Sequence, residues 1–316
     1  MSKTDVIVLN NIGGGINIWV DHLPAPYESV MGYGFEVSED LAKGGNVAVA
    51  ISRLGIPTAI IGKIGCDQAG DRDYKWLCDS GVNCEALIQS PEAKTGQGLG
   101  INERGTGRNL IVTGETSSKW LTKEEVERGL ELLSPAKFFI TGFEIKEELV
   151  LPAAEKAKSL GMKVVLNPSP LPKVEMNDLS YVDYFIVNDI EAKKLLELPE
   201  ESNLDVKKAC FDLQAKYHCA NVIITLGGDG YAGLDGEHWF SGAQIPVSPI
   251  IDTAGAGDGF LSAMVANLIW GKSLEDACKW ANKYAAKVVL IDGTLKGYST
   301  VEELESFYRE RGESLE

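Results

Sequence analysis

Three apolar segments of the sequence decide its fold: Val164-Val165-Leu166, Phe185-Ile186-Val187 and Val222-Ile223-Ile224-Thr225-Leu226. Their apolar residues are nearly continuous rather than alternating with polar ones, which is typical of strands covered on both faces. Helical patterns over residues 191–196 and 206–217 separate the second segment from the third. Strands that alternate with helices in this way predict a parallel sheet between two helical layers, and therefore an α/β protein.

The same alternation extends to both ends of the chain. Further strands are predicted over residues 6–9, 59–61 and 138–140, and further helices over residues 46–54, 124–133, 149–160, 261–270, 274–290 and 301–311. Neither an internal repeat of 20–50 residues nor a low-complexity linker interrupts the pattern. We therefore expect residues 1–316 to form a single domain.

Two segments predict strands without helices between them. They lie within about 12–42 and 96–113, and the second contains the turn Glu103-Arg104-Gly105-Thr106-Gly107-Arg108 between strands over 98–101 and 110–113. We expect these segments to form a small antiparallel sheet that projects from the α/β body. A further hairpin is predicted from residues 231–234 and 238–240, around Asp235-Gly236.

The charge of the chain limits its partners. It carries 30 Lys and Arg against 46 Asp and Glu, a formal net charge of −16. This charge repels phosphate backbones and anionic lipid, so we expect neither nucleic acid nor a membrane surface as a partner. An anionic substrate would need a local site where backbone N–H groups or a cation outweigh the overall charge.

The cysteines and the N-terminal residues indicate the cellular compartment of the protein. The six cysteines contain no C-x-x-C pair and no Cys/His cluster, so we expect neither a structural zinc site nor a redox dithiol. The segment before the first predicted strand is too short and wrongly flanked for a signal peptide. No apolar run approaches the roughly 18 residues of a membrane span. We therefore expect a cytoplasmic protein with reduced thiols.

The segment Asp252-Thr253-Ala254-Gly255-Ala256-Gly257-Asp258-Gly259-Phe260, ahead of a helical pattern, is the most informative for chemistry. Small residues at a helix start leave backbone N–H groups open at the positive end of the helix dipole, where anionic oxygens bind. A carboxylate in such a place would repel phosphate, unless it accepts a proton from a hydroxyl that attacks the phosphate. The alternative is that Asp258 favours the helix start and the glycines only turn the chain.

Three further segments combine glycines or capping residues with the ends of predicted elements: Lys43-Gly44-Gly45-Asn46, Asn188-Asp189-Ile190-Glu191 and Thr225-Leu226-Gly227-Gly228. The first could place backbone and an amide against a polyhydroxyl ligand, the second could face a metal-bound phosphate, and the third permits close approach of a nucleotide. An ordinary helix start also explains the first segment, and a capping box explains the second. Each alone therefore leaves both interpretations open.

The content and order of these four segments resemble the ribokinase-like (PfkB) family of sugar kinases, from Val6 to the last helix. D-T-x-G-A-G-D, the most specific motif of that family, is matched in full by residues 252–258, and Asn167-Pro168-Ser169-Pro170 is similar to its N-P-x-P strand end. The resemblance implies a ribokinase-like three-layer α/β/α fold with a mostly parallel central sheet and a small antiparallel β lid. It also implies transfer of the γ-phosphoryl group of ATP, with Mg²⁺, to a hydroxyl of a small sugar-like acceptor.

The resemblance implies a role for individual residues as well. Asp258 is implied as the base that takes the proton of the acceptor hydroxyl. The amides of Gly255, Ala256 and Gly257 are implied as the anion hole for the migrating phosphoryl group. The remaining implied contacts are Asn17, Gly45, Asn46 and Glu144 for the acceptor; Asn188, Thr225, Gly227, Gly257 and Asn282 for the nucleotide; Asn188 and Glu191 for Mg²⁺ through water; and Asp252 and Ala254 for a monovalent cation such as K⁺, which only part of the family binds. The lid often forms a dimer interface in the family, which implies a homodimer.

One position departs from the family pattern. Many members that act on sugars carry an aspartate two residues after the position of Asn17, whereas this chain has Trp19 there, and Asp21 could replace it only if the turn is shifted. The acceptor could then be an unusual sugar, a polyol, a sugar acid or a nucleoside, with Trp19 stacked on a ring face. Arg104 and Arg108 of the lid turn could meet a charged acceptor, or could simply be solvated.

Two other functions stay open at this point. One is a nucleoside kinase of the same fold. The other is a non-catalytic α/β sensor that keeps the nucleotide cleft and only binds metabolites. The intact Asp258 argues against a sensor, because a protein that only binds gains nothing from a base at this position.

Overall fold

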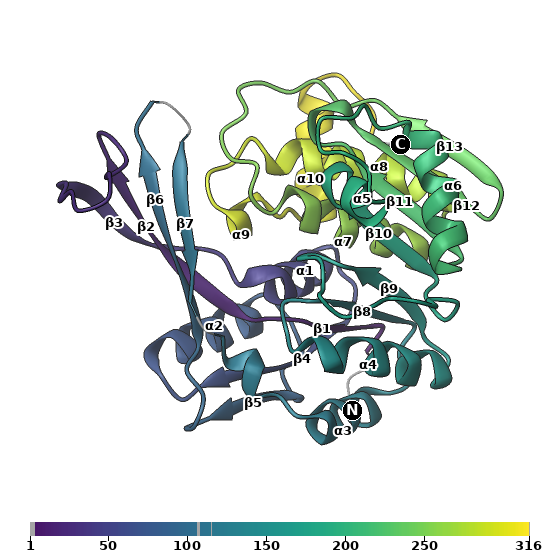
Figure 1. Ribbon diagram of the computed structural model, residues 1–316, viewed down its shortest axis with the longest axis horizontal. Helices are drawn as coiled ribbons and strands as arrows, with labels where there is room; N and C mark the ends of the chain where they lie inside the picture. The colour runs from purple at the N-terminus through teal and green to yellow at the C-terminus, as the bar shows by residue number, and fades with distance from the viewer. Residues whose placement is uncertain (1–3, 106–107, 115, 316) are drawn as a thin grey trace.

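The computed structural model describes residues 4–105, 108–114 and 116–315, and Thr106 and Gly107 of the predicted lid turn lie outside them. The body has a central sheet between two layers of helices (Figure 1). The order of its strands is β13-β12-β11-β10-β9-β8-β1-β4-β5. These strands are β1 (Val6–Leu9), β4 (Thr58–Gly65), β5 (Leu87–Ser90), β8 (Phe138–Gly142), β9 (Lys163–Asn167), β10 (Tyr184–Asn188), β11 (Asn221–Thr225), β12 (Tyr231–Asp235) and β13 (His238–Gly242).

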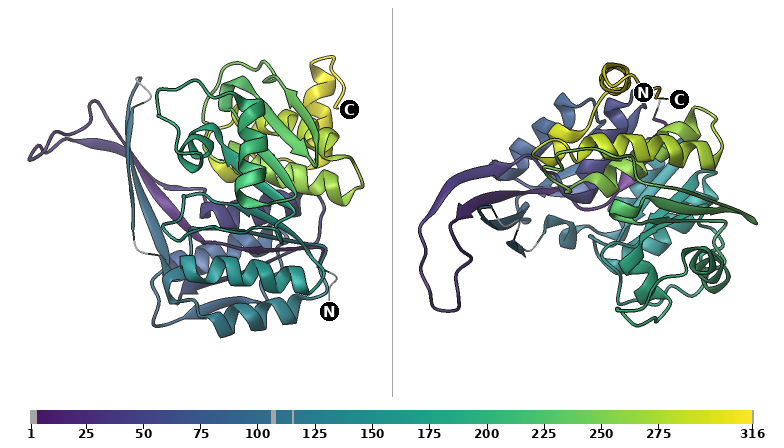
Figure 2. Two further views of the ribbon diagram at one scale, coloured as in Figure 1. Left: turned by 45° about the vertical axis from the view of Figure 1, so that its right-hand side comes forward. Right: turned by 90° about the horizontal axis from the view of Figure 1, so that it is seen from above.

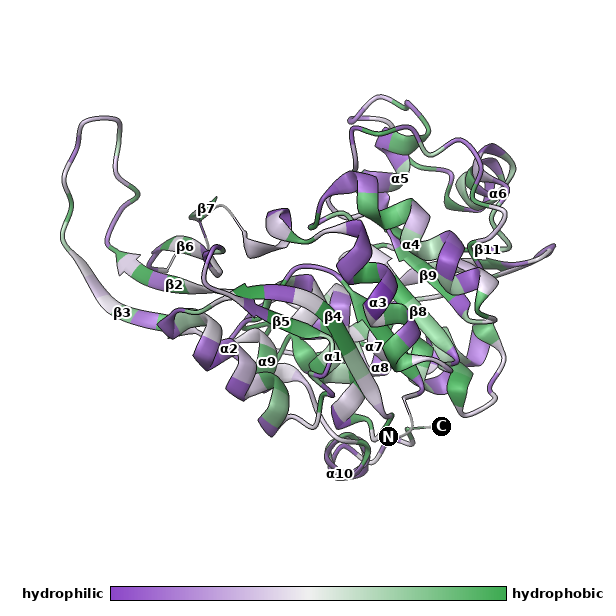
Figure 3. Ribbon diagram, turned by 90° about the horizontal axis from the view of Figure 1, so that it is seen from below, coloured by the Kyte–Doolittle hydropathy of each residue, from purple (hydrophilic) through white to green (hydrophobic). Residues whose placement is uncertain are grey.

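The pairing of this sheet confirms the expected α/β fold. All pairs from β5 to β11 are parallel, and only the hairpin β12–β13 adds antiparallel pairs at one edge. Figure 3 colours much of β4 and β8 as hydrophobic, as expected of strands covered on both faces. On β1 the side chains of Val6 and Val8 enter one core, whereas those of Ile7 and Leu9 enter the other. The sheet therefore separates two hydrophobic cores.

Each core is closed by its own helices. One layer consists of α1 (Ala42–Arg53), α2 (Gln68–Asp79), α7 (Ala256–Ile269), α8 (Leu274–Val288), α9 (Thr294–Gly297) and α10 (Val301–Glu310). The other consists of α3 (Lys123–Leu133), α4 (Glu147–Ser159), α5 (Asp189–Leu195) and α6 (Val206–Tyr217). Two short 3-10 turns, η1 (Ser117–Trp120) and η2 (Gly227–Asp229), complete the body. Among the described residues, no helix is both long and apolar enough to cross a bilayer.

The structure adds elements that the sequence analysis did not predict. Helix α2 and strand β5 were not expected. The start of α2 does carry a local signal, because Asp67 caps the helix by accepting a hydrogen bond from Gly70 N at 2.8 Å. Helix α7 begins at Ala256, five residues before the predicted start. Its beginning is set by Gly255, whose φ of 74° turns the chain directly into the helix. The second part of the glycine-rich motif, from Ala256, therefore forms the first turn of α7, and residues 252–255 lead into it.

The remaining strands form the lid, a second sheet in the order β3-β2-β6-β7 that stands away from the helical layers (Figures 1 and 2). They are β2 (Gly13–Val20), β3 (Gly32–Ser38), β6 (Gly96–Glu103) and β7 (Asn109–Thr113). The pairs β2–β3 and β6–β7 are antiparallel, as predicted. The central pair β2–β6 is parallel, because the chain between these strands passes through the body and enters the lid again from the same end.

Candidate active site

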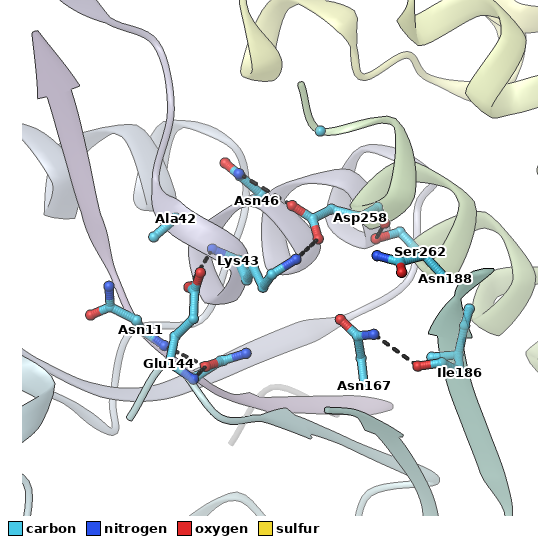
Figure 4. A network of polar contacts seen from close by, with 12 residues as sticks. Asn11, Ala42, Lys43, Asn46, Glu144, Asn167, Ile186, Asn188, Asp258 and Ser262 are labelled. Carbon is cyan, nitrogen blue, oxygen red and sulfur yellow. Dashed lines mark hydrogen bonds and ion pairs between the residues drawn. The ribbon is translucent and has the colours of Figure 1, made fainter. Parts of the chain in front are cut away.

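The N-terminal turns of α1 and α7 meet, and Asp258 lies between them (Figure 4). One oxygen of its carboxylate, Oδ1, is 3.6 Å from Lys43 Nζ. The other, Oδ2, accepts a hydrogen bond from Asn46 Nδ2 at 3.4 Å. Two motifs that are more than 200 residues apart in the sequence thus form one polar cluster.

Burial controls the charges of this cluster. Asp258 is 9% exposed, and burial raises its pKa above the ordinary value while Lys43 partly offsets that effect. Burial alone would lower the pKa of Lys43, but the carboxylates of Asp258, Glu144 and Glu191 outweigh it, so the pKa of Lys43 is raised. A buried carboxylate next to a lysine that stays charged is suited to accept a proton.

A pocket of about 280 Å³ lies between the lid and the start of α1. It is lined by Asn11, Gly13, Gly14, Gly15, Asn17, Ser38, Asp40, Ala42, Gly96, Gln97, Gly98, Leu99, Gly100, Thr116 and Glu144. Of the residues that were predicted to hold the acceptor, Asn17 and Glu144 line this pocket. Asn46 lies next to it through a hydrogen bond from its Nδ2 to Asp40 Oδ2, 3.1 Å long.

Trp19, which was predicted to meet the acceptor, and Arg104 and Arg108, for which solvation was the alternative, lie elsewhere. Trp19 is not among the residues that line the pocket, and its ring lies beside Gly34 of β3. The guanidinium of Arg104 lies 3.7 Å from the centre of the Tyr33 ring, and Arg108 Nη1 is 3.2 Å from Glu103 Oε2. The described pocket therefore offers neither a stacking indole nor a cation to the acceptor.

The carboxyl group of Glu144 reaches the pocket from the segment after β8. Its Oε2 accepts a hydrogen bond from Lys43 N at 3.1 Å, and its own backbone N–H donates to Asn10 Oδ1 at 3.2 Å. Burial raises the pKa of Glu144 to about 7, although Lys43 acts in the opposite direction. Glu144 therefore changes its charge close to neutral pH.

Asp40 and the side chain of Lys43 take a part in this cluster that the sequence pattern did not indicate. Asp40 Oδ1 accepts from Ala42 N at 2.8 Å, and Oδ2 accepts from Asn46 Nδ2 at 3.1 Å. In the sequence, an aspartate just before a helix looks like an ordinary turn residue. Lys43 was noted only as part of its motif. Nothing local in the sequence reports which side chains face a pocket.

The first turn of α7 presents the predicted phosphate site. The N-cap Gly255 has no side-chain cap, and a Cβ built at Gly257 would meet no atom within 4 Å. The N–H of Ala256 already donates to Thr253 O at 3.3 Å, so it is less available than the sequence analysis assumed. On the opposite side, a Cβ at Gly255 would overlap Thr294 Cγ2 and lie 2.7 Å from the hydroxyl of Tyr298. This turn has room for a phosphate on one side only.

Polar residues on the nucleotide side follow the ends of β10 and β11. Asn188 and Glu191 form a complete capping box on α5, with Asn188 N donating to Glu191 Oε2 at 2.9 Å and Glu191 N donating to Asn188 Oδ1 at 2.7 Å. Thr225 Oγ1 donates to Val187 O at 3.4 Å. Gly227 has a φ of 54° and open space where a Cβ would lie. Residues at the carboxyl ends of neighbouring parallel strands share one edge of the sheet, where ligands bind in α/β proteins.

The other predicted ligand residues have local partners. Asn282 of α8 donates from Nδ2 to Ala243 O at 2.8 Å. Asp252 Oδ1 accepts from Ala254 N at 2.9 Å. Gly45 is buried in the first turn of α1, and a Cβ there would overlap the side chain of the N-cap residue Leu41, so this glycine allows close packing at the start of the helix.

Oxygen donors near the phosphate site fit Mg²⁺ only in part. Asn188 and Glu191 offer amide and carboxylate oxygens, which Mg²⁺ prefers. Over the described part of the chain, no group of three or more His, Cys, Asp and Glu side chains could hold a metal ion. A magnesium ion at this place would therefore need water and nucleotide phosphates as its other ligands.

Comparisons with known proteins agree with this arrangement. A model of the "pfkB family carbohydrate kinase" matches residues 20–300. The chain is 26% identical over 305 residues to a deoxyribokinase of Salmonella typhi, covering 96% of this chain and 98% of that protein. It is 28% identical over 298 residues to a ribokinase of Mus musculus, covering 93% and 91%.

A solved structure gives the same result. The ribokinase of Thermotoga maritima superposes with a TM-score of 0.86 at 25% identity, over 97% of this chain and 99% of that one. The fold and the family expected from the sequence are thus confirmed. This chain belongs to the PfkB family of carbohydrate kinases and is a phosphotransferase that transfers the γ-phosphoryl group of ATP to an alcohol group of a sugar or sugar-like acceptor.

Proposed function

We propose that the acceptor binds in the pocket between the lid and α1, and that Asp258 is the catalytic base. The observation that carries this proposal is the position of Asp258: its buried carboxylate is held between Lys43 and Asn46 at the first turn of α7. This turn lies beside the pocket because Asn46 also contacts the lining residue Asp40.

The residues then divide the reaction between them. Asp258 removes the proton of the acceptor hydroxyl while the oxygen of that hydroxyl forms a bond to the γ-phosphorus of ATP. The bond between that phosphorus and the bridging oxygen breaks, and ADP leaves with its electrons. The amides of Gly255 and Gly257, with a smaller part for Ala256, stabilise the negative charge on the migrating group. Lys43 lowers the pKa of Asp258 and so favours its ionised form, in opposition to burial, which raises that pKa.

The nucleotide and its ions occupy the other side of α7. We propose that Thr225, Gly227 and Asn282 line the nucleotide groove. Asn188 and Glu191 would hold Mg²⁺ through water, and the ion would neutralise charge on the phosphates of ATP. The backbone oxygens near Asp252 and Ala254 are the proposed site of a monovalent cation such as K⁺.

The lid is proposed as the contact surface of a homodimer. Val37, Ile16, Leu99 and Val112 form one apolar row across its four strands, and within this row Leu99 also lines the pocket. Three members of the apolar row are exposed: Val37 by 49%, Leu99 by 36% and Val112 by 60%. A second copy of the lid would remove this apolar surface from water.

Sedimentation velocity tests the dimer. We expect a dimer for the wild type and a monomer for Val112→Asp, because a carboxylate in the apolar row opposes its burial. Leu132→Asp, which changes a side chain on α3 that is 42% exposed, is the matched control and should stay dimeric. A wild type that is monomeric at all concentrations would contradict the dimer.

The activity is tested by ADP release with a panel of pentoses, hexoses, polyols, sugar acids and nucleosides. We expect at least one polyhydroxylated compound to stimulate ADP release. Asp258→Asn should lower kcat by about 10²- to 10⁴-fold, the usual contribution of a general base. Asp212→Asn is the control, since Asp212 lies in an exposed ion pair with Lys208 on α6.

The outcomes separate the candidate functions. Preference for nucleosides over free sugars would indicate a nucleoside kinase of the same fold. Equally slow turnover of wild type and Asp258→Asn with every acceptor would refute the role of Asp258 and favour a protein that only binds metabolites.

A further inference from the structure

The charge of the acceptor pocket limits what it can bind. Among the fifteen described residues that line it, Asp40 and Glu144 carry the only charged side chains, and neither lysine nor arginine is present. The lid contributes Gly13, Gly14 and Gly15 of β2 together with glycines of β6, so much of that wall is bare backbone. With two carboxyl groups and no lysine or arginine among its lining residues, the pocket disfavours an acceptor that carries a carboxylate or a phosphate, and the neighbouring ammonium of Lys43 is paired with Asp258.

Asp40 has free hydrogen-bonding capacity in this pocket. Among the described residues, its Oδ1 accepts one hydrogen bond, from Ala42 N, and its Oδ2 accepts one, from Asn46 Nδ2. Each oxygen of a carboxylate can accept two hydrogen bonds. Asp40 can therefore accept two more, one at each oxygen, from a ligand in the pocket that it lines.

The amide of Asn46 fixes Asp40 relative to the base. Its Nδ2 has two protons and lies 3.1 Å from Asp40 Oδ2 and 3.4 Å from Asp258 Oδ2. Its Oδ1 accepts from Leu41 N at 3.0 Å, which prevents rotation of the amide. The two carboxylates are thus attached to the same nitrogen. An acceptor whose reacting hydroxyl meets Asp258 must place its neighbouring hydroxyl groups close to Asp40.

We propose that Asp40 determines acceptor specificity: it accepts hydrogen bonds from two neighbouring hydroxyl groups of an uncharged sugar or polyol whose reacting hydroxyl lies at Asp258. This inference rests on the proposed role of Asp258. It narrows the acceptor class, since it excludes sugar acids and sugar phosphates. In this role, the carboxylate of Asp40 is a charged partner for the non-reacting hydroxyl groups and is already in position before the acceptor binds.

Steady-state kinetics of Asp40→Asn test the proposal. The acceptors are D-ribose, ribitol, 2-deoxy-D-ribose, 3-deoxy-D-ribose and D-ribonate, measured beside the panel above. For the neutral acceptor that wild type uses best, we expect KM to rise about 10- to 100-fold, the effect of losing hydrogen bonds to a charged group. We expect kcat to change less than about threefold, because Asp258 keeps its place. Wild type should use D-ribonate poorly, and Asp40→Asn should reduce that disadvantage.

Deoxy analogues show whether Asp40 contacts hydroxyl groups directly. Wild type should discriminate against the analogue that lacks a hydroxyl bound by Asp40, and Asp40→Asn should treat it much like the parent sugar. Asp40→Ser retains an oxygen for Ala42 N and should show the same loss as Asp40→Asn. Glu39→Gln is the matched control, because the neighbouring carboxylate pairs with Lys296 at 3.2 Å outside the pocket, and its KM should stay unchanged.

Different results overturn the inference and the function on which it rests. An unchanged KM in both Asp40 variants, or a loss confined to kcat, would show that Asp40 only supports Asn46. Better turnover of D-ribonate than of every neutral acceptor by wild type would refute the specificity. In each of these cases, a large loss of kcat in Asp258→Asn would still support Asp258 as the catalytic base. If Asp258→Asn stayed active, both the proposed role of Asp258 and the specificity role of Asp40 would be refuted.

Discussion

The two sides of the active site are built in different ways. The phosphate side is a single run of seven residues, 252–258, whose backbone leads into α7 and forms its first turn from Ala256 onward. The acceptor side combines the lid strands, the turn before α1 and the segment after β8, and its contact between Lys43 N and Glu144 Oε2 joins residues 101 apart in the sequence. One side therefore depends on local backbone geometry, and the other on tertiary placement of carboxylates.

This difference predicts different kinetic effects. Interactions of the phosphate side strengthen in the transition state, when charge develops on the migrating group, so changes there should lower kcat. Contacts of the acceptor side exist already in the bound complex, so changes there should raise KM. The variants below test this division in order of expected effect.

Of the three variants considered next, Gly255→Ala should have the largest effect. Gly255 has a φ of 74°, and a Cβ would overlap Thr294 Cγ2 and approach Tyr298, whose hydroxyl donates to Gly255 O at 3.2 Å. We expect kcat to fall about 100-fold because the amides move away from the phosphoryl group. The unfolding free energy should fall by about 1–3 kcal/mol, measured by urea denaturation.

The neighbouring glycine provides the comparison for stability. A Cβ at Gly257 meets nothing within 4 Å, so the unfolding free energy of Gly257→Ala should be the same as that of wild type or higher. Equal stability of Gly255→Ala and wild type would contradict the geometric requirement at Gly255.

Lys43→Met should shift the pH dependence of kcat. Burial raises the pKa of Asp258, Lys43 counteracts it and Asp40 adds to it. Without the lysine the pKa of Asp258 must rise further, so a higher pH is needed to ionise the base. We expect the acid limb of the kcat profile to move to higher pH, with a lower kcat on the acid side of it. Lys296→Met removes an exposed ion pair with Glu39 and should leave the pH profile unchanged. An acid limb that does not shift in Lys43→Met would argue against the pairing of Lys43 with Asp258.

Glu144→Gln should have a smaller effect that appears in KM. Burial raises the pKa of Glu144 to about 7. The ionised form accepts stronger hydrogen bonds from acceptor hydroxyls, so the KM of wild type should fall about fivefold as the pH rises through 7. Glu144→Gln does not titrate, and its KM should be independent of pH in this range. A KM of wild type that stays constant from pH 6 to 8 would exclude this role.

The raised pKa of Glu144 also affects stability. A carboxyl group whose pKa is higher in the folded state stabilises the fold below its ordinary pKa of about 4.5, and this contribution is lost as the pH rises through about 7. The stability of wild type relative to Glu144→Gln should therefore decrease between pH 5 and pH 8, which thermal unfolding can measure.

The fold was predictable where the sequence pattern repeats. The prediction of residues 206–217 as a helix is confirmed at both ends, and each predicted strand of the parallel sheet is present. Helix α2 and strand β5 were missed. Half of the twelve residues of α2 are charged or amide residues, so its apolar stripe is weak, and β5 has only four residues.

The site residues were likewise predictable only where a local sequence pattern marks them. Asp258, Lys43-Gly44-Gly45-Asn46 and Asn188 to Glu191 stood out because glycines and capping residues mark the ends of elements. Trp19 was assigned to the acceptor from its spacing to Asn17, yet only Asn17 lines the pocket. Asp40 was overlooked because an aspartate in a turn has no distinctive pattern.

The sequence by itself determined the alternation of strands and helices, the glycine-rich start of α7 and the family of the chain, because each depends on residues that are neighbours along the chain. Only the tertiary structure decided that Asp40, Asn46, Glu144 and Asp258 share one polar cluster, and that Trp19 lies outside the pocket. Their positions depend on how the lid and two distant helix starts pack together, and long-range packing sets both the burial and the charge of these groups.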